Sequence, residues 1–191
     1  MAERGILLSR RRDRLALALL GVLAFVLHAW IKARHGLLPE LLWGCNLTAL
    51  LLIFGFAFDW PLAVGTAFLW RLGIGDPGFL AGVWSGERYF WTAALIHLAP
   101  TGLAAFYLRR SGLPRASAWW GLAFCLAAVL LALAFTPPEL NVNFAFRRIP
   151  LLADWFPGRW SYRAAVGGVA AVMLFGMDAL AVHWFRRPAG V

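Results

Sequence analysis

The chain has 191 residues, of which 62% are hydrophobic and only 14% are charged. A soluble domain is usually about 45–50% apolar and about 25% charged, so this composition excludes a disordered chain, a coiled coil and an ordinary soluble globule. Lys and Arg number 18 against 9 Asp and Glu, which gives a net charge of +9. Because the basic residues cluster at the ends of apolar runs, membrane topology and anionic lipid headgroups explain the excess better than nucleic acid does.

Apolar runs are the main feature of the chain, and a bilayer span needs about 20 apolar residues. We therefore expect an all-α, polytopic membrane protein, a bundle of about six transmembrane helices, in a single transmembrane domain of residues 1–191. The first run follows a cluster of arginines and has no A-x-A cleavage site after it, which favours a retained signal anchor. The six predicted spans are residues 15–31, 41–58, 61–72, 89–108, 116–135 and 164–185.

The connections between the runs differ in character. Residues 73–78, Gly-Ile-Gly-Asp-Pro-Gly, are predicted to interrupt the third span, because Gly and Pro break regular helix. Residues 79–84 are then a short interfacial or re-entrant piece. Arg71, beside Trp70, is expected to reach the outer headgroups. Residues 136–162 form a longer polar and aromatic connection before the last span.

Orientation follows from the basic residues. Six spans place both termini on one side, and the dense basic cluster before the first span usually decides which side that is. We therefore expect both termini in the cytoplasm, with the protein integral to the cytoplasmic (plasma) membrane. Most of the tryptophans lie near predicted span ends, as expected of an aromatic belt.

Polar side chains from several spans fall at similar depths when a helical rise of about 1.5 Å per residue is applied. Such groups usually face the protein interior or a water-filled cavity, so we expect a cavity that opens to the outer leaflet, or inward if the orientation is reversed. In an extended segment, the two asparagines after span five would point the same way. The residues expected at this cavity are Cys45, Asn46, Thr48, Arg71, His97, Thr101, Asn141 and Asn143, with His28 at its edge.

A cysteine and a histidine at this level can perform acyl transfer, in which a thiolate attacks and an imidazole takes the proton. In this hypothesis Cys45 is the nucleophile and His97 the base. Asn46 or Thr48 orients the imidazole or stabilises the oxyanion. Thr48 is an alternative nucleophile, because it shares a helix face with Cys45. Each residue also has an ordinary structural role, since buried cysteines are commonly inert and helical threonines often bond their own backbone.

Four short segments carry a resemblance to a known family: Leu38-Pro39, Trp43-Gly44-Cys45-Asn46-Leu47-Thr48, His97, and Asn141-Val142-Asn143-Phe144. In this order the chain resembles the YwaF-like integral membrane proteins, whose animal relatives include a cysteine-dependent phospholipid acyltransferase. It is also similar to the androgen-induced membrane hydrolases, which use a threonine and a histidine. The resemblance implies a compact six-span bundle, with Cys45 as the acyl nucleophile and His97 as its base.

Other functions remain open at this point. The protein is alternatively a non-catalytic binder or transporter of a lipid, a quinone or a small solute, or an accessory membrane subunit. In the transport hypothesis the Gly- and Pro-rich break lines a cavity. Haem ligation by His28 and His97 is a weaker alternative. The leading hypothesis needs no cofactor and no metal ion, and its partners are membrane lipids, with no nucleic acid.

Overall fold

The computed structural model describes residues 2–86, 89–148, 155–156 and 158–185, with the side chains of residues 2–10 and 159 left out. Over this part the chain is helical and contains no strand. The long helices are α1 (Ala2–Arg34), α2 (Gly44–Ala57), α3 (Pro61–Trp70), α4 (Asp76–Trp84), α5 (Trp91–Ser111), α6 (Ser117–Phe135) and α8 (Arg159–Phe185). The shorter elements are a π-helical segment, η2 (Arg71–Gly75), and three 3₁₀ turns, η1 (Leu38–Leu42), η3 (Pro138–Leu140) and η4 (Val142–Phe144).

Four stretches of the described chain are long and apolar enough to cross a membrane: Arg11–Arg34, Trp91–Ser111, Ser117–Phe135 and Trp160–Phe185. A fifth apolar helix, Gly44–Ala57, is shorter. The prediction of an all-α chain with several helices long and apolar enough to cross a membrane is therefore confirmed. The last helix begins at Arg159, five residues before the predicted start at Ala164, because the apolar run alone does not mark its first turn.

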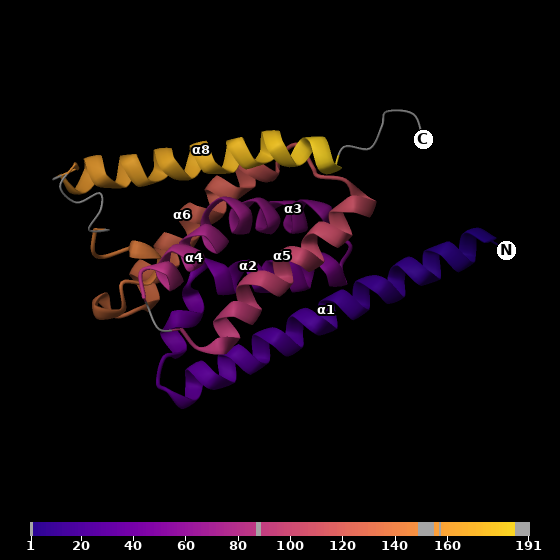
Figure 1. Ribbon diagram of the computed structural model, residues 1–191, viewed down its shortest axis with the longest axis horizontal. Helices are drawn as coiled ribbons and strands as arrows, with labels where there is room; N and C mark the ends of the chain where they lie inside the picture. Colours follow the sequence, from indigo (N-terminus) through magenta and orange to yellow (C-terminus); the bar gives the residue numbers. More distant parts are fainter. Residues whose placement is uncertain (1, 87–88, 149–154, 157, 186–191) are drawn as a thin grey trace.

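Helix α3 is the centre of the bundle. All eight of its residues from Ala63 to Trp70 are buried, and it packs against α2, α5, α6 and α8. A helix that is apolar on every face is stable only when other elements surround it. Figure 1 shows α1 and α8 on opposite sides of the molecule, with α2, α3, α5 and α6 between them.

The irregularity predicted at residues 73–78 is present, since residues 71–75 are not α-helical, but the predicted end of the helix is wrong, because the chain stays helical from Pro61 to Trp84. At η2 the backbone widens to a π turn, in which the Asp76 N–H donates to the Arg71 carbonyl five residues earlier. Pro77 has no N–H to donate, and it directly follows the π turn, where the regular i→i−4 pattern is already interrupted. The wider turn therefore accommodates the Gly and Pro residues, and the helix continues.

Contacts at the two ends of the bundle establish the direction of α2. Lys32 near the end of α1 forms an ion pair with Glu40 of η1. Asp59, after the end of α2, forms an ion pair with Arg14 near the start of the apolar part of α1, and it accepts a hydrogen bond from Tyr107 near the end of α5 at 2.7 Å. Helix α2 therefore runs antiparallel to α1 from one end of the bundle to the other.

Candidate functional site

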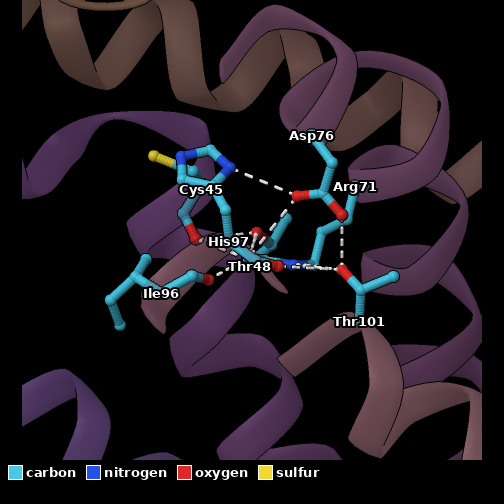
Figure 2. Close-up of polar contacts among 7 residues, drawn as sticks. All are labelled: Cys45, Thr48, Arg71, Asp76, Ile96, His97 and Thr101. Carbon is cyan, nitrogen blue, oxygen red and sulfur yellow. Dashed lines mark hydrogen bonds and ion pairs between the residues drawn. The ribbon is translucent and has the colours of Figure 1, made fainter. Parts of the chain in front are cut away.

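Arg71 is the most deeply buried charged residue that the structure describes, with 0% of its surface exposed. Its guanidinium has five N–H donors, and each has an acceptor, as Figure 2 shows. The prediction that Arg71 reaches the headgroups is therefore wrong. The acceptors are Thr101 Oγ1 (3.0 Å), the Cys45 carbonyl (2.9 Å), Thr48 Oγ1 (3.0 Å), the His97 carbonyl (2.9 Å) and the Ile96 carbonyl.

Pro100 explains why α5 can offer a backbone carbonyl to Arg71. In a regular helix the N–H of residue 100 would donate to the Ile96 carbonyl, but proline has no N–H. The carbonyl left free would be costly inside a membrane protein. Arg71 Nη2 donates to this carbonyl. The arginine therefore supplies the hydrogen bond that the proline cannot make.

Asp76 supplies the counter-charge of the buried arginine. Its carboxylate lies 3.7 Å from Arg71 Nη2, and its Oδ2 accepts a hydrogen bond from the Thr101 hydroxyl at 2.6 Å. Thr101 thus accepts from Arg71 and donates to Asp76. A buried charge is stable only when it is paired and hydrogen-bonded, and the three side chains meet that requirement together.

His97 is held by the same carboxylate. Its Nδ1 lies 3.2 Å from Asp76 Oδ1, and its ring stacks on Phe79 with centroids 4.4 Å apart and planes 10° apart. An ionised carboxylate only accepts hydrogen bonds, so Nδ1 carries the proton and Nε2 is left as a base. A carboxylate that orients a histidine in this way is the arrangement of an acid–base catalyst.

Cys45 joins this cluster through its backbone. The Cys45 carbonyl accepts hydrogen bonds from Arg71 and from the Thr48 hydroxyl, both at 2.9 Å. Its half-buried thiol is free and lies in the first turn of α2, close to the backbone N–H groups of Cys45 and Asn46. Among the described residues, no hydrogen bond joins the Cys45 sulfur to the His97 ring.

The structure brings together five of the residues predicted at the site: Cys45, Thr48, Arg71, His97 and Thr101. Thr48 is fully buried. Its hydroxyl donates to a backbone carbonyl and accepts from Arg71. The predicted oxyanion or nucleophile role therefore requires the hydroxyl to leave those partners.

The three predicted asparagines lie outside the network. The Asn46 amide donates to the Glu40 carbonyl at 3.0 Å. Asn143 accepts from the Gly44 N–H at 2.7 Å and donates to the carbonyls of Leu42 and Ala128 at 2.8 and 2.9 Å. It therefore ties η1, α2 and α6 together rather than lining the network.

The segment that holds Asn141 and Asn143 is not extended, so the condition for the two side chains to point the same way is not met. Both residues have a left-handed backbone, with φ of 46° and 54°; Asn141 lies between η3 and η4, and Asn143 lies within η4. Asn141 accepts hydrogen bonds from the N–H groups of Phe146 and Arg147, so its side chain organises its own loop. Asparagine tolerates this backbone conformation better than most residues.

His28 is buried, with 3% of its surface exposed. Its Nδ1 lies 2.9 Å from the Thr92 hydroxyl. The pair links α1 to the first turn of α5, near the site but without a contact to Arg71 or Asp76 among the described residues. We interpret it as a structural hydrogen bond between two helices.

Asp76 is the site residue that sequence analysis missed, since it was placed within a predicted break. One signal was present in the sequence: Arg71 and Asp76 are the only charged residues between Trp60 and Gly86. In an α-helix, residues five apart do not share a face. Only the π turn at η2 brings the two side chains together.

No protein-family model, curated protein or solved structure matches this chain. The resemblance to the YwaF-like proteins therefore stays a prediction. The functional conclusion rests on the geometry around Asp76 and His97.

Proposed function

We propose that the protein is a membrane enzyme that transfers or hydrolyses acyl chains of lipids, with Cys45 as nucleophile and His97 as general base. Asp76 is the residue that positions the base. The observation that carries the proposal is the 3.2 Å contact between Asp76 Oδ1 and His97 Nδ1, which leaves Nε2 free to take a proton. A thiol becomes a nucleophile only when a base takes its proton.

The reaction proceeds in two balanced steps. His97 Nε2 takes the thiol proton as Cys45 Sγ attacks the ester carbonyl, and the C–O bond then breaks. The leaving alkoxide takes the proton back from the imidazolium, so the enzyme holds a Cys45 thioester and a lysolipid is released. Water or a second lipid hydroxyl then attacks the thioester, again with His97 as base, and the thiol is restored.

Six membrane spans are part of this proposal. Residues 61–84 would rise about 36 Å at 1.5 Å per residue, enough for a hydrocarbon core about 30 Å thick. Helix α2 alone would rise about 21 Å, so its crossing includes η1, which precedes it. The contacts of Asp59 with Arg14 and Tyr107 support two crossings by these segments. They put the turn between the segments beside the first half of α1 and the end of α5, opposite the end of the bundle where η1 begins. The basic cluster in the first half of α1 favours cytoplasmic termini in a plasma membrane.

The test is turnover of mixed phospholipids by the purified, detergent-solubilised full chain, followed by mass spectrometry. We expect wild type to remodel acyl chains and both Cys45→Ala and His97→Ala to abolish turnover. Asp76→Asn should lower kcat by a factor of about 10² to 10⁴, because the imidazole loses its orienting carboxylate. The products identify the lipid and show whether water or a lipid is the acceptor.

The matched control is Cys125→Ala. Cys125 lies in α6 and accepts a hydrogen bond from Trp70 Nε1 at 3.2 Å, away from His97. The Cys125→Ala variant should turn over lipid within about twofold of the wild-type rate, a difference of under 0.5 kcal/mol in transition-state free energy. Thr48→Val tests the alternative nucleophile. A well-folded Cys45→Ala protein with full turnover would refute the cysteine mechanism, and an inert wild type would refute the enzyme proposal.

A second candidate is binding or transport of a small solute coupled to protons. The buried Asp76–His97 pair favours it, since titratable groups inside a membrane protein commonly mark ion or proton pathways. In this case Cys45→Ser would keep function, whereas Asp76→Asn would abolish solute-dependent proton uptake in proteoliposomes. Lipid turnover that requires the Cys45 thiol would exclude this candidate as the main activity.

A further inference from the structure

A second polar feature lies away from the Arg71 network, where the connection after α6 meets the start of α8. It is a pocket of about 280 Å³. Among the described residues that line it, three of seven are arginines and none is acidic. The lining consists of Phe144, Ala145, Phe146, Arg147, Arg148, Tyr162 and Arg163.

The loop side of this pocket is held in one conformation. Asn141 Oδ1 accepts from the N–H groups of Phe146 and Arg147 at 3.0 and 2.7 Å, and its Nδ2 donates to the Arg147 carbonyl at 3.3 Å. Phe144 has a left-handed backbone, with φ of 53°, which is unusual for a bulky residue. Such strain persists only where the surrounding contacts impose it. Arg147 therefore projects from an ordered backbone.

The helix side of the pocket adds a second source of positive potential. Arg163 lies four residues after the first residue of α8 and brings a third guanidinium to the pocket from the helix. Its guanidinium lies over the Trp160 ring, 5.4 Å from the centroid. Trp160 is 76% exposed, as expected of a tryptophan at the level of lipid headgroups. Figure 1 shows this start of α8 at the same end of the molecule as the orange loop before it.

We propose that this pocket binds a phosphate group, carried as the phosphodiester of a lipid headgroup or as free inorganic phosphate. The planar fork of arginine matches phosphate geometry with two parallel hydrogen bonds. A volume of about 280 Å³ lies just below the usual range for drug-sized ligands, so it suits a headgroup rather than a whole lipid. The proposal does not depend on catalysis at Cys45.

The test measures binding rather than turnover. The purified full chain in uncharged detergent is titrated with sodium phosphate by calorimetry, against sodium chloride of equal ionic strength. In parallel, native mass spectrometry counts retained phosphatidylglycerol molecules. We expect Arg147→Gln and Arg163→Gln each to weaken binding about tenfold, because each removes a charge-assisted contact. The double variant should lose binding. Arg147→Lys, which keeps only the charge, should bind more weakly than wild type and more tightly than Arg147→Gln.

The matched control is Arg34→Gln, an exposed arginine at the end of α1. It removes the same charge at the same end of the bundle and should leave binding within about twofold, a difference of under 0.5 kcal/mol. Phosphate binding without lipid retention identifies a free anion as the ligand, and retention of the lipid identifies a headgroup. If wild type binds neither probe, or the double variant binds as wild type does, the proposal is overturned.

Discussion

At the scale of single residues, the hydroxyl of Thr101 joins the two charges of the buried network. It accepts from Arg71 Nε at 3.0 Å and donates to Asp76 at 2.6 Å. We expect Thr101→Val to lower the free energy of unfolding by about 1–3 kcal/mol, because two buried polar groups each lose a partner. Unfolding in a denaturing detergent, followed by tryptophan fluorescence, measures the change.

Thr66 provides the control for this substitution. It is a buried threonine of α3, and its Oγ1 has no hydrogen-bond partner among the described residues. Thr66→Val has the same change in shape, and removing an unsatisfied hydroxyl is neutral or stabilising. Equal losses for the two variants would mean that the Thr101 hydrogen bonds contribute little beyond packing.

At the scale of elements, close packing of α2 on the π segment holds Cys45 in place. A Cβ at Gly44 would lie 2.4 Å from Trp70 Cζ2, and one at Gly75 would lie 2.5 Å from Trp70 Cζ3. The indole of Trp70 thus lies against two glycines from different elements. Because Gly44 directly precedes Cys45, a shift of α2 would also move the cysteine relative to His97.

We therefore expect Gly44→Ala to destabilise the protein by about 1–3 kcal/mol through overpacking and to lower any activity at Cys45. The control is Gly78→Ala in α4, where a Cβ would meet no atom within 4 Å. That substitution should be neutral or slightly stabilising, since alanine favours helix over glycine. The midpoint of thermal unfolding in detergent compares the two. A Gly44→Ala protein as stable as Gly78→Ala would show that α2 can move away from Trp70 at little cost.

At the scale of the whole molecule, the number of membrane crossings depends on which side the turn after α2 occupies. In a chain without its two native cysteines, we expect Phe58→Cys to react with a membrane-impermeant maleimide only after the cells are permeabilised. Phe58 is 74% exposed, so accessibility from the correct side is assured. Six spans with cytoplasmic termini place this turn inside.

Ser85→Cys, at the end of α4, is the matched reporter and should react in intact cells. Reaction of both positions in intact cells would indicate four spans, with α2 to α4 outside the bilayer. Reaction of Phe58→Cys but not Ser85→Cys would keep six spans and reverse the orientation. Each outcome therefore separates the count of spans from their direction.

Some elements were predictable because local composition decides them. The apolar run 116–135 lies within one residue of α6 (Ser117–Phe135), and the run 89–108 overlaps α5 (Trp91–Ser111). At residues 73–78 the departure from regular helix was predictable, because Gly and Pro are ordinarily helix breakers, but the continuation of the helix was not, because nothing local signals a π turn. Packing of this segment against α5 and α8 stabilises the helix that its composition disfavours.

By itself, the sequence determined an all-helical membrane protein, because hydropathy and helix length depend only on consecutive residues. It also predicted that Cys45, Thr48, Arg71, His97 and Thr101 lie at one level of the bundle, since depth follows from position along each helix, and the structure brings these five together. Only the tertiary structure decided how they combine. The pairing of Arg71 with Asp76 requires the π turn. The hydrogen bond from Arg71 to the Ile96 carbonyl requires that Pro100 leave this carbonyl without its helical partner and that another element place Arg71 beside it. Hydrogen bonds of this kind depend on the directions and distances between atoms of different helices. The residue pattern within one helix carries no information about them.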